Sequence, residues 1–241
     1  MKGTLIILAL MFGTTGILAQ SQKSRQETYL QVGVKAGAAY STITDLAKTL
    51  VSESYYTGYT FTNKGSMSFA GSLYINYKLQ ESISAFYAEL SYARLGNSLH
   101  YSDNRELEYD LESRYDFLNI EFYYKAYILE GLSLATGPRI GFNLTPGGLY
   151  YTSNGEALYG PDIRIQQQMR DVIKGRTNFA LGISLGYELA NGLSLDARYY
   201  FGMNDVIETE INNFHFIENR NMSRTIQVTI GYAIPYNLKF F

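Results

Sequence analysis

The chain has 241 residues and a formal charge of −2, from 20 Lys and Arg against 22 Asp and Glu, and it contains no Cys. This balance provides no basic surface for a phosphate backbone, so no nucleic-acid partner is expected. Without Cys, and with only two His, the sequence excludes disulfides, thiolate metal sites and multi-histidine metal sites, and no cofactor is predicted.

The first twenty residues, MKGTLIILALMFGTTGILAQ, have a basic start at Lys2, then an apolar stretch, then small residues that lead to Ala19. This order predicts a secretory signal peptide over residues 1–19. The alternative is a membrane anchor, but the apolar stretch is shorter than the ~20 residues that a spanning helix needs. The sequence therefore predicts an exported chain with one domain over residues 20–241.

Eight segments in the rest of the chain alternate apolar and polar side chains with the period of a β-strand. The clearest alternation lies in NFALGISLGYEL, which the hairpin signal Asn191-Gly192 separates from the next segment. The predicted strands cover about 29–40, 69–79, 83–96, 115–129, 132–144, 177–189, 193–202 and 223–234.

Long and short connections take turns between these strands. The long ones are predicted at 41–68, 97–114, 145–176 and 203–222, and the others are short turns. This arrangement is typical of outer-membrane barrels, which have short periplasmic turns and long external loops. We therefore predict an all-β fold, an eight-stranded antiparallel up-and-down transmembrane β-barrel, with both chain ends on the side of the short turns.

The composition of the two strand faces indicates which face meets lipid. A soluble, lipocalin-like barrel is the alternative, but its polar face would be rich in Lys, Glu and Asp, whereas here that face is mostly small residues. The apolar face is predicted to point outward and to carry no charge in any of the eight strands. Tyr40, Tyr77, Tyr187 and Tyr232 fall near strand ends, as expected for an aromatic girdle at the membrane surface.

If the apolar face points outward, nine charged side chains share the lumen. Because buried charges must be paired, they are predicted to form a structural network that fills the lumen. A gated channel or proton path is the alternative, although eight strands leave little internal space. The nine residues are Lys35, Lys78, Glu89, Glu121, Lys125, Arg139, Glu188, Asp196 and Arg198.

Several segments resemble the PorT-like outer-membrane β-barrel family of Bacteroidetes-type bacteria. They are GVKAGAAYSTI at 33–43, YAELSYARLG at 87–96, GPRIGFNL at 137–144 and GYELANGLSLDARYYFG at 186–202. One departure is Glu121, which stands where that family often has Pro. The resemblance implies an eight-stranded outer-membrane barrel, generally without enzyme activity; one branch of the family serves gliding and protein secretion.

Three further motifs were open to a functional interpretation. Gly182 to Gly186 matches the G-x-S-x-G nucleophile elbow, but Ser184 lies within a predicted strand and is interpreted as a small lumen residue. His100 and His215 fall in predicted outer loops, where a rim site acting on lipid A by acyl transfer is chemically conceivable. The segment 163–174 has helical apolar spacing, with a strand extension as the alternative.

These observations predict an integral protein of the bacterial outer membrane with no enzyme activity and with structural or interaction roles for its external loops. The expected partners are outer-membrane lipid or lipopolysaccharide, and other outer-membrane proteins. A second hypothesis is an accessory subunit of an outer-membrane secretion or assembly complex, and a third is the rim acyl-transfer or hydrolase enzyme.

Overall fold

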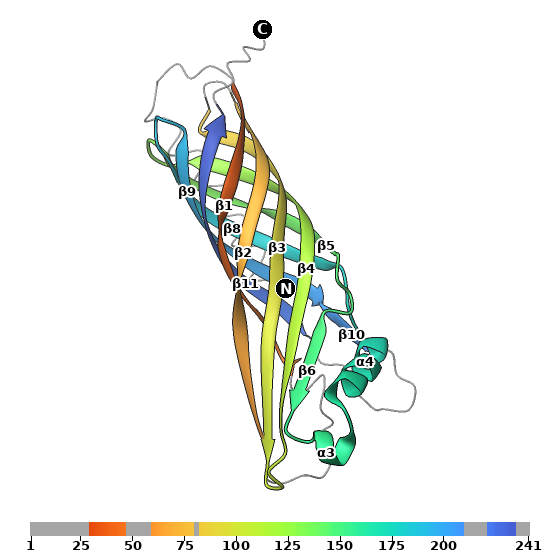
Figure 1. Cartoon of the computed structure of the whole chain (residues 1–241). Coiled ribbons are helices and arrows are strands. Elements are labelled where there is room, and N and C mark those ends of the chain that lie inside the picture. The colour runs from red at the N-terminus through yellow and green to blue at the C-terminus, as the bar shows by residue number, and fades with distance from the viewer. Residues whose placement is uncertain (1–28, 47–58, 80–81, 210–220, 235–241) are drawn as a thin grey trace, which may run out of the picture.

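The computed structural model describes residues 29–46, 59–79, 82–209 and 221–234, and this part of the chain is almost entirely antiparallel β-structure (Figure 1). The predicted signal peptide lies outside the described residues. Eight strands pair in the order β1, β2, β3, β4, β5, β8, β9 and β11, and β11 pairs with β1. The sheet is therefore a closed ring, and the predicted eight-stranded up-and-down barrel is confirmed.

The bounds of the ring strands are β1 (Tyr29–Ile43), β2 (Tyr59–Lys78), β3 (Ser84–Asp103), β4 (Glu108–Tyr127), β5 (Leu132–Asn143), β8 (Asn178–Glu188), β9 (Leu193–Asp205) and β11 (Met222–Ile234). The smaller elements are β6 (Leu149–Ser153), α3 (Glu156–Tyr159), α4 (Asp162–Val172), β7 (Ile173–Gly175) and β10 (Ile207–Thr209). The smaller elements gather at one end of the barrel (Figure 1). Among the residues described, no helix has the length and apolar character needed to cross a membrane.

Tight turns join the strands at the other end, where β1 begins and β11 ends (Figure 1). At the predicted Asn191-Gly192 hairpin, the Leu189 N–H donates to the Leu193 carbonyl at 2.8 Å. Gly192 has φ of 89°, and Gly131 in the β5 entry turn has φ of 77°. Such backbone conformations favour glycine because a Cβ would be strained there, so the glycines make these short turns possible.

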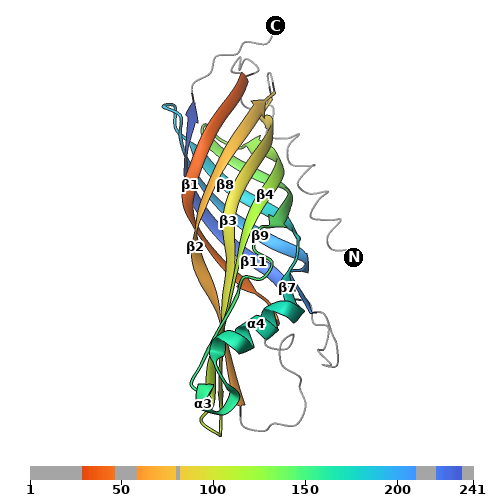
Figure 2. The ribbon, with the colours of Figure 1, turned by 45° about the vertical axis from the view of Figure 1, so that its right-hand side comes forward.

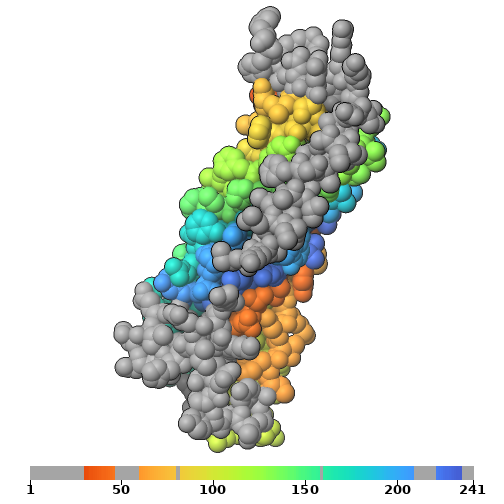
Figure 3. Space-filling view, turned by 180° about the vertical axis from the view of Figure 1, so that it is seen from behind, coloured from red at the N-terminus to blue at the C-terminus, as the bar shows by residue number. Residues whose placement is uncertain are grey.

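The outward face of the barrel is a belt of exposed apolar side chains, with the polar face turned inward. Along β8, for example, Phe179, Ile183 and Leu185 are exposed, while the alternate residues are buried. All four tyrosines predicted for the girdle point outward, each 39–48% exposed. In the space-filling view from behind, the strands form tilted bands around this surface (Figure 3).

Three strands continue well beyond the predicted boundaries, so the predicted loop at 97–114 is wrong. β3 continues to Asp103 and β4 begins at Glu108, so the two strands form a hairpin across this segment. β2 begins at Tyr59, inside the predicted loop 41–68. We name residues 59–65 of β2, 95–103 of β3, 108–115 of β4 and the whole of β6 the outer sheet; β6 pairs with β4 there. In Figures 1 and 2 it projects past the rest of the barrel.

The alternation is not lost in the outer sheet; it is inverted. In β3 the inward side chains change from Glu89 and Ser91 to Leu95 and Leu99, while the outward ones change from Leu90 to polar residues. β4 shows the same inversion. Water replaces lipid on the outside at this level, so the apolar face must turn inward to be buried. A prediction that requires outward apolar residues along the whole strand therefore places the outer ends of β3 and β4 too close to the membrane.

A β-bulge adds to the difficulty in β2. The pairing of β2 with β3 shifts between Gly65 and Ala70, where β2 has one more residue than β3. One extra residue moves every later side chain to the opposite face. Phe61 and Asn63 therefore share the inward face with Tyr101 and Leu99, respectively, and the period of two predicted from 69–79 does not continue in phase.

The prediction of an uncharged outward face is wrong where the outer sheet begins on β3 and β4, and also at Arg224 of β11, which shares a face with Ile226. Arg94 and Asp116 both lie on that face and form an ion pair, with Arg94 Nε 2.7 Å from Asp116 Oδ1. The hydroxyl of Tyr92 donates to the same oxygen at 2.7 Å. Because charged side chains are costly in the hydrocarbon layer, this pair marks the level at which the apolar belt ends.

We expect Gly37→Ala to destabilise the barrel, because a Cβ at Gly37 would collide with the carbonyl oxygen of Val228 where β1 closes onto β11. Overpacking of this kind costs about 1–3 kcal/mol. Unfolding in urea and detergent, followed by circular dichroism, measures the change. Gly147→Ala is the control, because nothing lies within 4 Å of a Cβ there; equal midpoints for the two variants would contradict the expectation.

Candidate functional site

The centre of the lumen is occupied by Arg198 of β9, which lies between two carboxylates. Its Nη2 is 2.7 Å from Glu89 Oε2 on β3, and its Nη1 is 3.3 Å from Glu121 Oε2 on β4. The three side chains come from opposite walls of the barrel, and all three are buried. The ion pairs therefore join the walls through the interior.

Buried tyrosines complete the coordination of the two carboxylates. The Tyr87 hydroxyl donates to Glu89 Oε2 at 2.6 Å, and the hydroxyls of Tyr123 and Tyr200 donate to Glu121 Oε2 at 2.8 and 2.9 Å. Each carboxylate thus has both a cationic and a phenolic partner. Such charge-assisted hydrogen bonds compensate for the water that burial removes.

Two more cations extend the central network. Lys35 Nζ lies 2.7 Å from Asp196 Oδ2 and 3.8 Å from Glu89 Oε2. Arg139 Nε lies 3.8 Å from Glu121 Oε1, and the Arg139 guanidinium lies 4.2 Å from the centre of the Tyr200 ring. These contacts connect β1, β5 and β9 to the two carboxylates at the centre.

The remaining predicted lumen residues form a second group toward the short turns. Lys125 pairs with Glu188, and the Tyr127 hydroxyl also donates to Glu188 at 3.1 Å. Lys78 Nζ lies 4.1 Å from the centre of the Tyr127 ring. All nine predicted residues thus face the lumen, six of them in the central network and three in this group.

Removing the central cation should strongly destabilise the barrel. In Arg198→Met, Glu89 and Glu121 lose their shared partner while buried, which typically costs about 3–5 kcal/mol. Unfolding in urea and detergent measures the loss. Arg114→Met, at an exposed pair with Glu112, is the matched control and should change stability by less than about 1 kcal/mol. An Arg198→Met midpoint equal to that of the control would contradict this expectation.

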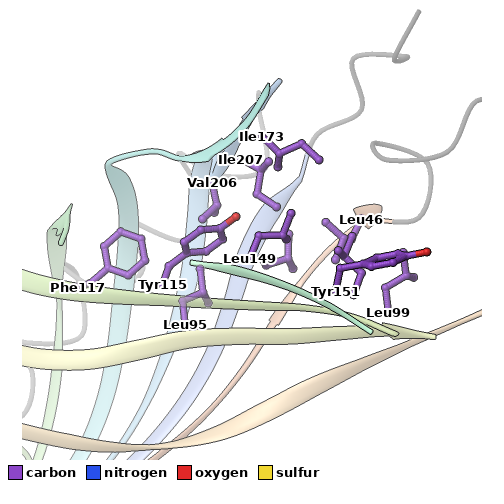
Figure 4. Packing of buried hydrophobic residues seen from close by; sticks show 12 residues of the cluster. Leu46, Leu95, Leu99, Tyr115, Phe117, Leu149, Tyr151, Ile173, Val206 and Ile207 are labelled. Atoms are coloured by element: carbon purple, nitrogen blue, oxygen red, sulfur yellow. The ribbon is translucent and has the colours of Figure 1, made fainter. Parts of the chain in front are cut away.

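The outer end of the lumen is closed by an apolar cluster that the sequence analysis missed. We name it the cap. It is made by residues from the outer sheet and the adjoining part of β4, from β1 and the segment after it, and from β7, β10 and the β9 to β10 connection. Their side chains point toward one another (Figure 4). Its buried members are Ile43, Leu46, Leu95, Leu99, Leu111, Tyr115, Phe117, Leu149, Tyr151, Ile173, Val206 and Ile207.

The helix predicted at 163–174 is confirmed up to Val172, where α4 ends; residues 173 and 174 belong to β7. The apolar side chains of α4 pack on this cap. Ile165, Met169 and Val172 contact the cluster. The alternative of a strand extension is therefore wrong for Asp162–Val172. The signal that could have located the cap is the inverted alternation of leucine and tyrosine in β3 and β4.

A second face of α4 lies along the edge of β6 (Figure 1). Asp162 and Gln166 accept hydrogen bonds from the N–H groups of Ser153 and Tyr151, at 2.6 and 3.0 Å. Arg170 Nε donates to the Leu149 carbonyl at 2.7 Å. Four helical residues advance about 6 Å and two strand residues about 6.6 Å, so the two spacings match. The helix therefore covers an edge of the sheet that could otherwise pair with a strand of another molecule.

The tip of the outer sheet is held by Asp103. Its Oδ1 accepts hydrogen bonds from the N–H groups of Arg105 and Leu107, at 2.8 and 3.1 Å, and its Oδ2 accepts one from the Tyr101 hydroxyl. Desolvation acts to raise the pKa of Asp103, but these donors outweigh it and hold the pKa below its ordinary value. The turn is therefore stabilised at neutral pH, and this contribution is lost as the pH falls through the pKa of the folded protein.

The other sequence motifs show no catalytic arrangement in the described part of the chain. Ser184 is buried within β8 and faces the lumen. His100 lies on β3, not in a loop, and its Nδ1 is 2.9 Å from Asp110 Oδ1; His215 lies outside the described residues. Within the described ranges, no three His, Asp or Glu side chains are grouped so that they could hold a metal ion.

A closed ring of eight strands with an apolar outer belt and a polar, filled lumen defines an integral membrane β-barrel. The sequence matches the family described as outer membrane protein beta-barrel domain over residues 19–208, which is more than half of the chain. The chain therefore belongs to this family and is an integral protein of the outer membrane. No curated protein matches the sequence significantly.

Solved structures of similar architecture come from several bacteria. Neisserial surface protein A (NspA) is 14% identical, with 85% of this chain and 97% of NspA covered and a TM-score of 0.39. OprG from Pseudomonas aeruginosa is 12% identical, with 87% and 98% covered and a TM-score of 0.44. Ail from Yersinia pestis, solved with the heparin analogue sucrose octasulfate, is 13% identical, with 87% and 100% covered and a TM-score of 0.39.

The cap should be less stable when its centre is emptied. Leu149 is fully buried, so Leu149→Ala should cost about 2–5 kcal/mol. We expect faster hydrogen exchange in β6 and α4, with exchange in the barrel wall unchanged. Ile163→Ala, at a side chain that is 66% exposed on α4, is the control. Unchanged protection of β6 in Leu149→Ala would show that the cap does not hold the outer sheet in place.

Proposed function

We propose that this barrel is a non-enzymatic membrane anchor that displays a rigid external surface for interaction with other outer-membrane components. The observation that carries the proposal is the outer sheet. Segments predicted as loops instead continue as paired strands, supported from behind by the cap and at the edge by α4. A surface that stays ordered without a partner loses less conformational entropy on binding.

The outward face of the outer sheet is polar and in register across four strands. Thr62, His100, Asp110 and Thr152 follow one another on adjacent strands β2, β3, β4 and β6. On β4, Glu108, Asp110 and Glu112 share this face. Polar and acidic groups arranged in register on one face of a sheet favour recognition of another polar surface, so lipopolysaccharide or another outer-membrane protein is the proposed partner.

The filled lumen supports a role that does not require conduction. The central carboxylates and cations are buried and engage one another, and the cap closes the outer end. An open pathway would require several of these contacts to break together. This arrangement supports an interpretation of the nine charged residues as a structural network rather than a gated channel.

The resemblance of the segments at 33–43, 87–96, 137–144 and 186–202 to the PorT-like family supports a second candidate, an accessory subunit of an outer-membrane secretion or assembly complex. In that case the outer sheet would be one of the contact surfaces. The rim enzyme has less support. His100 has an acidic partner in Asp110, but among the described residues no serine hydroxyl is hydrogen-bonded to its imidazole.

A detergent pull-down of the tagged protein from outer membranes tests the proposal. We expect protein or lipopolysaccharide to be retained by the wild type and depleted about tenfold with Asp110→Lys combined with Glu112→Lys, because the acidic face is reversed. Glu208→Lys, an exposed reversal on β10, is the control and should retain the companion. Recovery of the wild type alone, without protein or lipopolysaccharide, would refute the display role.

A further inference from the structure

One wall of the apolar belt is hollowed by a groove that the display role does not use. The groove has a volume of about 430 Å³ and crosses the outward face of β2, β3, β4 and β5. The residues that line it include Ile75, Tyr77, Phe86, Ala88, Phe122 and Thr136.

The register of the strands explains why this wall is concave. Ala88 lies directly between Ile75 and Phe122 on the neighbouring strands, so a small side chain separates two large ones. Phe86 and Phe122 flank it, at 57% and 54% exposure. The only short polar side chain that contributes, Thr136, donates its hydroxyl to the Gly182 carbonyl at 3.1 Å. The Thr136 hydroxyl is thus already hydrogen-bonded, and the surface that the groove presents is mainly apolar.

The groove lies in the half of the belt nearer to the short turns. Along β3, Ala88 is six residues from Arg94, which marks the outer limit of the belt, and Phe122 is six residues from Asp116. Six residues of a strand span about 20 Å. Since short turns face the periplasm in such barrels, the groove opens into the periplasmic leaflet.

We propose that this groove binds one acyl chain of a glycerophospholipid of the periplasmic leaflet. It is continuous with the lipid-facing belt, so acyl chains surround it at high concentration. A second copy of the barrel would present a convex wall, which touches the rims of a groove without filling it. A flexible apolar chain can lie along the floor at Ala88, between the two phenylalanine rings. There it makes van der Waals contacts with the floor and both sides of the groove, more than it would make with a smooth wall.

Native mass spectrometry of the protein purified from outer membranes in mild detergent, with phosphatidylethanolamine added back in a titration, tests this proposal. The wild type should retain one phospholipid. Ala88→Phe fills the groove and should lower the retained fraction about tenfold. Ala197→Phe is the matched control, because Ala197 is also an outward-facing alanine but lies on β9, four strands away in either direction around the ring.

A heat-dependent shift in gel migration establishes that each variant is folded, and Ala88→Leu replaces Ala88→Phe if the larger ring prevents folding. Retention of lipid by Ala197→Phe but not by Ala88→Phe supports the site. The proposal is overturned if the wild type retains no lipid or if both variants lose it equally. It is also overturned if the wild type is a dimer that Ala88→Phe dissociates, because the groove would then bind a second copy.

Discussion

The closure of the strand ring, through the pairing of β1 with β11, is the constraint on which the rest of this structure depends. In lipid no solvent can satisfy a free backbone N–H or carbonyl group, so a spanning sheet must have no edge. The register from Val32 against Ile234 to Ile43 against Ser223 provides that closure. Closing eight strands leaves a narrow interior, and every side chain that points inward must then find a partner there.

The lumen network answers this requirement with charge rather than with an apolar core. The inward positions of the strands alternate with the apolar outward ones and carry polar residues, and Arg198 pairs with Glu89 and Glu121 across the width of the barrel. Buried ion pairs are weak evidence for net stability, but they demand one specific arrangement. They therefore fix how opposite walls sit relative to one another, and a fixed barrel can support an ordered external sheet.

The level of the Arg94 and Asp116 pair separates two kinds of interior. On the side of the short turns, the outside of the barrel meets lipid and the inside is polar. On the side of the outer sheet, the outside meets water and the inside is the apolar cap. The same strands serve both parts, because β3 and β4 only exchange the chemistry of their two faces. The outer sheet is therefore held rigidly by the barrel wall, and this rigidity is the physical basis for the proposed display role. The groove proposed to bind lipid lies only on the membrane-spanning part of the strands.

By itself the sequence determined the ring: alternation located all eight strands, Asn191-Gly192 located a hairpin, and the phase of the alternation placed the nine charged residues inside. These are local properties that a period of two records directly. The tertiary structure alone decided which lumen charges pair, because partners such as Arg198 and Glu89 are far apart in sequence. It also decided the extent of the outer sheet, since the bulge near Gly65 shifts the phase in β2 and the change of surroundings inverts it in β3 and β4. The cap and the groove depend on the register between neighbouring strands, which the sequence of one strand does not specify.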